Sequence, residues 1–282
     1  MDGIILINKP TGITSYDVVR KAKKVFNTTK IGHTGTLDPF AEGLMILCVG
    51  KATKLSNRIL DSDKEYEGTI VFNHHYDTYD VTGKVINSDN KHITFEELLH
   101  ISKEFSGKME QIPPIYSAIK KDGKKLYEYA RKGIDINVDS RIINIKNFEI
   151  LNEESYNTFS FRTVVSKGTY IRSLAVDIAS KLNTFGALSK LKRTKLGDYS
   201  LLDAIQLDDL TTDNLVEIAK LYPNNPSLVV DDYIAKLVKN GVYLDERQIN
   251  TEQEFLVYND NQELIALYEP IGDNKYRPVI IF

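Results

Sequence analysis

The 282-residue chain has one cysteine, no tryptophan and no apolar stretch of the length needed to cross a membrane. A single thiol, Cys48, excludes an internal disulfide and a metal site built from several cysteines. Its apolar neighbours in GLMILCVG indicate a buried thiol, so redox chemistry is not expected. The first residues, MDGIILINKP, lack the basic start and the longer apolar segment of a signal peptide. These absences predict a cytoplasmic protein.

The net charge of −3 conceals an uneven distribution. From residue 196 onward there are 6 Lys and Arg against 16 Asp and Glu, a balance of −10, whereas the preceding residues carry 30 against 23, a balance of +7. The cations of this first part form short clusters: RKAKK, KATK, KKDGKK, RK and KLKRTK. Such clusters are common on solvated surfaces, but five of them beside an acidic tail favour a nucleic-acid-binding protein.

The order of the expected elements indicates the fold class. Strands are expected at GIILINKP, GLMILCVG and KEYEGTIVF, and half-buried antiparallel strands at IINIKNFEIL and TFSFRTVVS. Helices are expected in TSYDVVRKAKKVF, capped by Thr14 or Ser15, in KATKLSNRILDSD, near TFEELLHISKEFSG and in SKGTYIRSLAVDIASKLN. A hairpin should turn at residues 121 to 123. Since no strand-helix unit repeats, the expected fold is α+β, with a largely antiparallel mixed sheet.

A second unit follows LYPNNPSL, residues 221 to 228, whose Pro and Asn content indicates a linker. Beyond it lie a helical segment, DDYIAKLVKNG, and the candidate strands EFLVYND, ELIALYE and YRPVIIF. We therefore expect a main domain of residues 1–222 and a small β-rich domain of residues 229–282. A domain of this size is expected to need its neighbour for stability.

The segment GHTGTLDPFAEG places one carboxylate, Asp38, among glycines and hydroxyls, with no cation beside it. Asp-Pro pairs start many turns, so a turn is one interpretation. A second cluster, SKGTYIRS, offers another, because Gly168 permits a sharp turn and Tyr170 and Arg172 lie two residues apart. An Arg opposite Asp38 would orient the carboxylate and keep it ionised. Arg172 could equally cap a helix or lie at the surface.

Metal and phosphate sites are weaker interpretations. His33 and Asp38 could bind a metal, and HHYD, residues 74 to 77, could add ligands, but the spacing matches no known type of site. GHTGT could hold a phosphate through its backbone N–H groups, but it lacks the Lys and Ser/Thr of a nucleotide-binding loop. Neither a GxSxG motif nor a cysteine-histidine pair for acyl transfer is recognisable. The sequence therefore predicts neither a metal nor a cofactor.

Five segments resemble, in order and spacing, the TruB family of tRNA pseudouridine-55 synthases. They are GIILINKPTGITSYDVV, KIGHTGTLDPFAEGLMILCVGKATKLS, DSDKEYEGTI, IPPIYSAIKKDGKKLYEYARKG and SKGTYIRSLAVDIA. The pair GHTGTLDP and SKGTYIR is highly specific, and the similarity extends from residue 3 to about residue 200. The C-terminal part resembles a small PUA domain through LVKNGVYL and YRPVIIF.

The resemblance implies roles for seven residues. Asp38 would be the catalytic aspartate, Arg172 would pair with it, and Tyr66 would stack on the target base beside the reacting carbon. The residues implied to contact the flipped nucleotide or the loop it leaves, or to line the site, are His33, Tyr170, Leu191 and Lys54. The implied substrate is the T loop of tRNA, no metal or cofactor is implied, and a monomer is expected.

Pseudouridine formation breaks a C–N glycosidic bond, rotates the uracil and joins its C5 to the sugar, so it consumes neither a redox cofactor nor an energy source. It needs an ionised carboxylate near the anomeric carbon and walls that hold the freed base. Asp38 with Arg172 would supply the first, by covalent addition or by assisting elimination, and Tyr66 the second. A protein that only binds tRNA would share the basic clusters but would have no use for a buried Asp-Arg pair.

Two segments depart from the pattern of the family. Asn73 and Tyr76 stand where Gly and Thr are frequent, and Ala187 stands where a larger side chain is common. The residues of the first segment that fit the pattern are Asp77, Thr78, Asp80 and Gly83.

Overall fold

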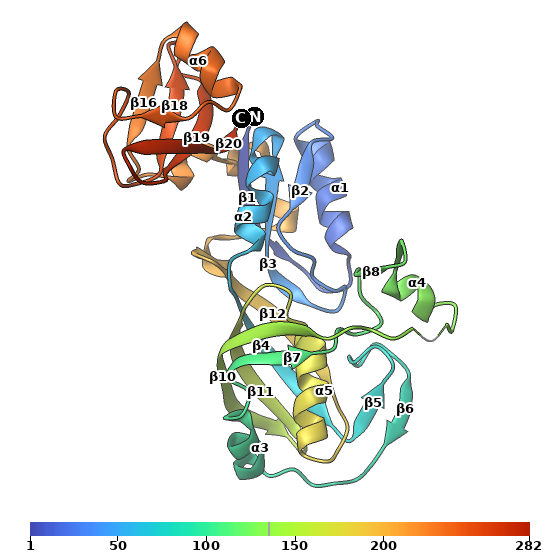
Figure 1. Cartoon of the computed structure of the whole chain (residues 1–282). Coiled ribbons are helices and arrows are strands. Elements are labelled where there is room, and N and C mark those ends of the chain that lie inside the picture. Colours follow the sequence, from blue (N-terminus) through green and yellow to red (C-terminus); the bar gives the residue numbers. More distant parts are fainter. Residues whose placement is uncertain (135) are drawn as a thin grey trace.

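The computed structural model describes residues 1–134 and 136–282, which form two main β-sheets with helices packed on them (Figure 1). The first sheet has eleven strands and contains the N-terminal strand, whereas the second has five strands and is built entirely from residues beyond 226. The two chain termini lie side by side where the two parts meet (Figure 1). The catalytic candidates all lie in the part that carries the first sheet.

Eight strands form the main path of the first sheet. Their order across the sheet is β14 (Ile205–Gln206), β1 (Gly3–Lys9), β3 (Glu42–Val49), β12 (Gly186–Leu196), β4 (Lys64–Phe72), β11 (Thr158–Val165), β10 (Arg141–Ser155) and β7 (Gly107–Gln111). Short strands extend it, with β2 (Ile31–His33) on β3, β13 (Tyr199–Ser200) on β12 and β15 (Val216–Glu217) on β1. The β1–β14 and β3–β12 pairs are parallel and the other described pairs of this sheet are antiparallel. The predicted α+β fold with a largely antiparallel mixed sheet is therefore confirmed.

Two helices cover parts of this sheet. Helix α5 (Ile171–Lys181) packs on β4, β11 and β12 in one hydrophobic cluster, and a Cβ at Gly186 would lie only 2.8 Å from the Cβ of Ala179. Helix α1 (Ser15–Val25) packs on β1 and β3 in another cluster. The other α-helices are α2 (Ser56–Leu60), α3 (Phe95–Ser102), α4 (Leu126–Ala130) and α6 (Asp232–Lys239). No described helix is long and apolar enough to cross a membrane.

Local signals explain two of the predicted elements. Thr14 is the N-cap of α1: its side chain accepts a hydrogen bond from the backbone N–H of Asp17, and the Asp17 carboxylate accepts one from the N–H of Thr14. The predicted hairpin consists of β8 (Lys120–Lys121) and β9 (Lys124–Lys125). Its turn residues, Asp122 and Gly123, have positive φ angles of 50° and 80°, as a two-residue hairpin turn requires.

Other segments differ from expectation. No element was predicted for GALSKLKRTKL, yet it forms β12 in the centre of the first sheet, because its exposed lysines hide the buried Leu191, Arg193 and Leu196. The expected helix in KATKLSNRILDSD consists of a 3-10 helix, Gly50–Leu55, followed by the short α2. Asn73 has a φ of 76°, and Asn tolerates this left-handed conformation better than most residues, which explains how it can replace Gly.

The second sheet has the strand order β16 (Ser227–Val230), β18 (Phe255–Asn259), β19 (Leu264–Pro270), β20 (Lys275–Ile281) and β17 (Leu244–Asp245). It starts at Ser227, two residues before the predicted domain start at 229. Leu256, Leu267 and Ile280 share a hydrophobic cluster with Ile4 and Ile46 of the first sheet. The small domain therefore packs on its neighbour through apolar contacts.

Candidate active site

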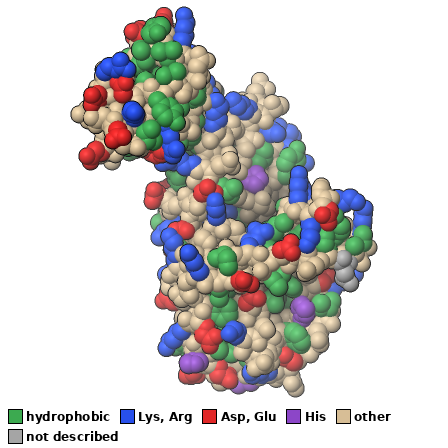
Figure 2. All heavy atoms as spheres, viewed as in Figure 1, with side chains coloured by type: hydrophobic (Ala, Val, Ile, Leu, Met, Phe, Trp, Pro, Cys, Tyr) green, Lys and Arg blue, Asp and Glu red, His purple; other side chains and the backbone are tan. Residues whose placement is uncertain are grey.

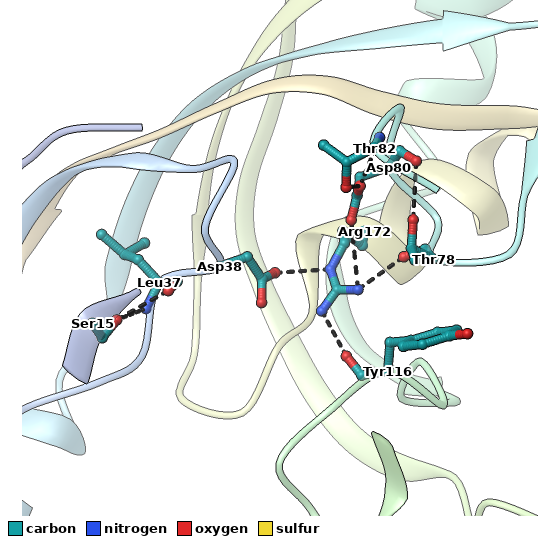
Figure 3. Close-up of polar contacts among 8 residues, drawn as sticks. All are labelled: Ser15, Leu37, Asp38, Thr78, Asp80, Thr82, Tyr116 and Arg172. Atoms are coloured by element: carbon teal, nitrogen blue, oxygen red, sulfur yellow. Dashed lines mark hydrogen bonds and ion pairs between the residues drawn. The ribbon is translucent and has the colours of Figure 1, made fainter. Parts of the chain in front are cut away.

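The loop that carries Asp38 connects β2 to β3 and is held from both sides. The hydroxyl of Ser15, the first residue of α1, accepts a hydrogen bond from the Leu37 N–H (2.9 Å) and donates one to the Leu37 carbonyl (3.0 Å) (Figure 3). The N–H of Gly12 donates to the Pro39 carbonyl, 2.8 Å away. The N–H of Ala41 donates to the Asp38 carbonyl, so the predicted turn exists in the backbone. The Asp38 side chain is free to point elsewhere.

That side chain points to Arg172, in the first turn of α5 (Figure 3). The Nε of Arg172 lies 2.8 Å from an Asp38 carboxylate oxygen, and Nη1 lies 3.7 Å from a carboxylate oxygen of Asp80. Nη1 and Nη2 also donate to the carbonyls of Thr78 (2.8 Å) and Tyr116 (2.9 Å). Only 5 % of the Arg172 side chain is exposed. The guanidinium is thus oriented by partners from three other loops and in turn fixes the direction of the Asp38 carboxylate.

The charges around Asp38 act in opposite directions. Burial raises the pKa of the Asp38 carboxyl from its ordinary value, and the nearby Asp80 carboxylate raises it further. The Arg172 guanidinium opposes this rise by stabilising the ionised form, as does the Lys9 ammonium to a smaller extent. Asp80 is itself buried, and Thr82 donates hydrogen bonds to it through its N–H (3.0 Å) and its hydroxyl.

Asp38 and Arg172 border a cavity of about 280 Å³. Tyr66 of β4 and Leu191 of β12 form part of its wall, and both are more than nine-tenths buried. Tyr170 closes another side, with its N–H donating to the Gln111 side-chain oxygen at 2.8 Å and its ring 5.8 Å from the Arg141 guanidinium. The cavity lies near the lower end of the size range of small-ligand pockets, about 300 Å³. It suits a single flat group stacked beside an aromatic side chain.

Two of the seven candidates do not line this cavity. Lys54, expected to line the site, lies in the 3-10 helix that follows β3, and its ammonium donates to the carbonyl of Ile281 in the last strand. Lys54 thus lies against the C-terminal domain in this structure. His33 is half-buried on β2, beside the cavity-lining Gly35, whose N–H donates to His33 Nδ1 (3.3 Å). Burial and the Arg193 charge lower the pKa of His33.

The cavity also contains two cations that were not predicted as site residues, Lys64 and Arg193. Lys64 precedes Tyr66 by two residues on β4, and this period-2 spacing places both side chains on one face of the sheet. That spacing was readable in the sequence. Arg193 lies within KLKRTK, where nothing distinguishes it from its exposed neighbours, although only 1 % of it is exposed.

The other polar groups do not indicate a second kind of site. Within the described residues, no three His, Cys, Asp or Glu side chains are close enough together to hold a metal ion. The Cys48 thiol is buried, and burial raises its pKa to about 12, so it is not a nucleophile at neutral pH. The chemistry that the arrangement can support is that of a positioned carboxylate beside an aromatic wall.

Solved structures of low sequence identity share the fold. A structure described as a Cbf5-Nop10-Gar1 complex aligns with a TM-score of 0.67 at 24% identity, covering 99% of this chain and 83% of that one. The archaeal box H/ACA sRNP Nop10-Cbf5 complex aligns with a TM-score of 0.66 at 22% identity, covering 99% and 85%. The fold is thus the α+β pseudouridine synthase fold.

Sequence comparisons identify the family. The family described as TruB family pseudouridylate synthase (N terminal domain) matches residues 23–171. The chain is 48% identical over 282 residues to tRNA pseudouridine synthase B of Acholeplasma laidlawii (strain PG-8A), and 44% identical over 286 residues to that of Onion yellows phytoplasma (strain OY-M). Both alignments cover 100% of both chains. The protein belongs to the TruB family of pseudouridylate synthases.

Proposed function

We propose that this protein isomerises uridine 55 in the T loop of tRNA to pseudouridine, with Asp38 as the catalytic residue. The observation that carries the proposal is the Asp38–Arg172 pair at the edge of a cavity that Tyr66 lines. The relatives of matching length are tRNA pseudouridine synthases, which supports this assignment of reaction and substrate.

The reaction is an intramolecular rearrangement. The C1′–N1 bond breaks, the uracil turns within the pocket, a C1′–C5 bond forms, and the proton lost from C5 is balanced by the proton gained at N1. An ionised Asp38 carboxylate removes the positive charge that develops at C1′ in one of two ways: it forms a C1′–O bond that breaks again when C5 attacks C1′, or it takes the C2′ proton and returns it when the C1′–C5 bond forms. Arg172 holds the carboxylate in one orientation, with 2.8 Å between its Nε and the nearest oxygen. This fixed geometry lowers the barrier because no reorientation is needed during the reaction.

The target base has to leave the stacked loop before it can reach Asp38. The Tyr66 ring replaces part of the lost stacking, which is worth about 1 to 3 kcal/mol for one base on one aromatic side chain. Leu191, on the neighbouring strand β12, faces the same cavity. We assign Tyr170 to the same binding site, because its ring lines the cavity next to Arg172.

The basic surface supports RNA as the partner. On the face shown in Figure 2, blue side chains gather over β8, β9 and α4. The strands β8 and β9 consist only of lysines, and the segment that precedes them, Ser117 and Ala118, lines the cavity beside Asp38. Cations at this place can neutralise phosphates of the stem while the target base enters the cavity.

The domain division and the setting are part of the proposal. We assign residues 1–222 to the catalytic domain and residues 229–282 to a PUA-like domain, which contacts the RNA through a surface of complementary shape rather than through charge. Residues 229–282 carry 5 Lys and Arg against 10 Asp and Glu, a balance of −5, so electrostatic attraction of RNA comes from the catalytic domain. We expect the protein to act as a monomer in the cytoplasm.

The test is to incubate the purified protein with an unmodified tRNA transcript in the presence of a chelator, and to map pseudouridine by carbodiimide labelling and primer extension. We expect one stop in the T loop for the wild type and none for Asp38→Asn, with tRNA binding retained by the variant. Tight tRNA binding without any stop for the wild type would refute the enzyme and leave a tRNA-binding protein.

A further inference from the structure

The walls of the cavity bury more positive than negative charge. Lys64 and Arg193 line it together with Arg172, and all three are more than nine-tenths buried. The carboxylates nearby are Asp38 and Asp80, and Arg172 lies within 4.0 Å of both. Among the described residues, neither Lys64 nor Arg193 has a carboxylate oxygen within that distance. Two buried cations at this site therefore lack a counter-ion.

The sheet brings these two cations together. In the antiparallel β4–β12 pair, Arg193 stands opposite Tyr66, and Lys64 lies two residues from Tyr66 on the same face of β4. The two are close enough for the Arg193 charge to oppose the protonation of Lys64, since burial and then Arg193 lower the Lys64 pKa to about 8. At pH 7 an ammonium with this pKa is still mainly charged. The stacking residue Tyr66 thus lies next to two like charges.

Both cations are oriented by backbone carbonyls. The Lys64 ammonium donates to the carbonyls of Leu60 (2.6 Å) and Ser62 (2.7 Å), which leaves one of its three N–H groups for another acceptor. Arg193 donates from Nε to Leu44 (2.7 Å) and from Nη2 to Gly35 (3.2 Å). Within the described part of the chain, its Nη1 donates no hydrogen bond, and this atom would lie 3.4 Å from a Cβ built on the cavity-lining Gly35.

Lys9 provides a contrast. It is also buried, and its ammonium donates to the carbonyls of Pro10 and Ile13, both at 2.8 Å. It does not line the cavity, and its ammonium interacts electrostatically with the carboxylates of Asp38 and Glu42. Burial without access to the cavity fits a structural role for Lys9, whereas Lys64 and Arg193 have spare donors at the cavity wall.

We propose that Lys64 and Arg193 form an anion site that holds a phosphodiester group flanking the flipped uridine. This inference rests on the proposed function, because RNA is the anionic substrate that the pocket would receive. Each flipped nucleotide carries a phosphate on either side of its sugar, and an ammonium beside a guanidinium is a strong combination for binding one. Binding supplies the missing counter-ion and anchors the sugar while the uracil is detached from it. The site thus positions C1′ relative to Asp38.

The test removes the charge from the RNA and from the protein separately. The substrates are T-arm stem-loops in which the phosphate on the 5′ or the 3′ side of the target uridine is replaced by an uncharged methylphosphonate. For the contacted linkage, we expect kcat/KM of the wild type to fall about tenfold, the value of one charge-assisted hydrogen bond. In Lys64→Gln the same replacement should cost clearly less than in the wild type, because one of the two charges that contact the phosphate is already absent.

Lys195→Gln is the matched control. Lys195 lies on β12 near Arg193, but it is exposed and lies 3.6 Å from Glu65, so this variant should keep the full tenfold sensitivity. Lys64→Arg preserves the charge and should also retain the sensitivity, which keeps the test usable if Lys64→Gln does not fold. Arg193→Lys should lose part of the sensitivity to the methylphosphonate, because the forked guanidinium donor is removed. Thermal melting checks that this variant is folded.

Three results would overturn the proposal. In the first, kcat/KM of the wild type does not fall with either methylphosphonate. In the second, the loss of kcat/KM from Lys64→Gln and the loss from the methylphosphonate multiply at both linkages. In the third, Lys195→Gln reduces the sensitivity to the methylphosphonate as much as Lys64→Gln does. In each case the wild type still modifies the all-phosphate RNA, so the proposed function survives. If the wild type does not modify that RNA, the proposed function itself fails. Dissociation constants measured in the Asp38→Asn background repeat the comparison independently of turnover.

Discussion

The cavity of the first sheet and the core of the second sheet bury very different groups. Around the cavity, Asp80, Lys64, Arg172 and Arg193 are all more than nine-tenths buried. The second domain buries aromatic and aliphatic side chains instead, with the Phe255 ring stacked on Tyr268 at 5.7 Å and edge-on to Tyr276 at 5.1 Å. Buried charges carry a desolvation cost that a fold does not need. Among the described residues, the charged side chains buried at the cavity have no counterpart in the core of the second domain, which supports the cavity as the site of binding and chemistry.

The ion pairs of the two regions differ in the same way. The difference lies in the arginines: the Arg172 side chain is 5 % exposed, whereas that of Arg277, paired with Glu269 at 2.6 Å, is 56 % exposed, and the acidic partners are exposed to a similar degree, 35 % for Asp38 and 28 % for Glu269. The short distance is similar, but water screens the second pair. Distance alone therefore does not identify a functional ion pair, and burial has to be considered with it.

The largest effect is expected for Arg172→Met. Removing the guanidinium leaves Asp38 and Asp80 without the cation that lies within 4.0 Å of both, and breaking a buried pair typically costs about 3 to 5 kcal/mol in the free energy of unfolding. Pseudouridine formation should fall by at least about a hundredfold, since the carboxylate loses its orientation. Urea denaturation and single-turnover assays measure the two effects. A stable and active Arg172→Met protein would contradict the assigned role.

Phe255→Ala should destabilise the protein to a similar extent without changing the chemistry. The ring is fully buried between two tyrosines, and loss of a buried phenyl group costs about 3 to 5 kcal/mol. We expect a lower melting temperature and an unchanged rate constant for bound, folded enzyme in single-turnover assays. A loss of that rate constant would show that the C-terminal core is coupled to the cavity.

The pH dependence should distinguish the cavity from the rest of the surface. Because burial raises the pKa of Asp38 and the proposed mechanism needs its ionised form, kcat/KM should fall on acidification with a midpoint above about 3.9, the ordinary carboxyl value. Since Arg172 opposes the rise, the Asp38 pKa should be higher still in Arg172→Met. Carbon NMR of labelled aspartates, assigned with Asp38→Asn, measures both values. A lower pKa in the variant would refute this account.

A smaller effect is expected for Tyr268→Phe. The Tyr268 hydroxyl donates to the Val242 carbonyl at 2.7 Å, and burial raises its pKa to about 12. Deleting the hydroxyl should cost about 1 kcal/mol, the net value of one such hydrogen bond. Calorimetry measures it, and tRNA modification serves as the control that should not change.

The smallest effect is expected for Arg277→Met. An exposed ion pair contributes less than about 1 kcal/mol, and high salt should remove the difference from the wild type. The matched comparison is Arg172→Met, whose effect should persist in high salt because the Arg172 guanidinium is buried. If both variants responded equally to salt, burial would not be what separates the two regions.

Much of the architecture was predictable because local signals were strong. The strands β1, β3, β4 and β11 follow apolar runs or strict alternation, and α1 follows the Thr14 capping motif. The strand β12 was not predictable, because four cations in KLKRTK obscure its alternation and only one of them, Arg193, is buried. Tertiary pairing with β4 over its whole length overrides that weak local preference.

The sequence was equally unable to predict which lysine lines the cavity. Lys54 and Lys64 lie ten residues apart in the chain, and neither position is distinguished by its composition. In the structure Lys54 contacts the last strand, whereas Lys64 lines the cavity. The difference depends on how the turn after α2 directs the chain back into β4, which involves contacts distant in sequence.

The sequence by itself determined the family, the α+β class, and Asp38, Arg172 and Tyr66 as the residues to examine, because motifs and periodicity are properties of short segments. Only the tertiary structure decided which charged side chains lie around the Asp38–Arg172 pair. In the structure Asp80 lies near Arg172, Lys54 lies outside the cavity, and Lys64 and Arg193 line it. The reason is physical: burial and electrostatic interaction depend on distances between segments that strand register and helix packing set.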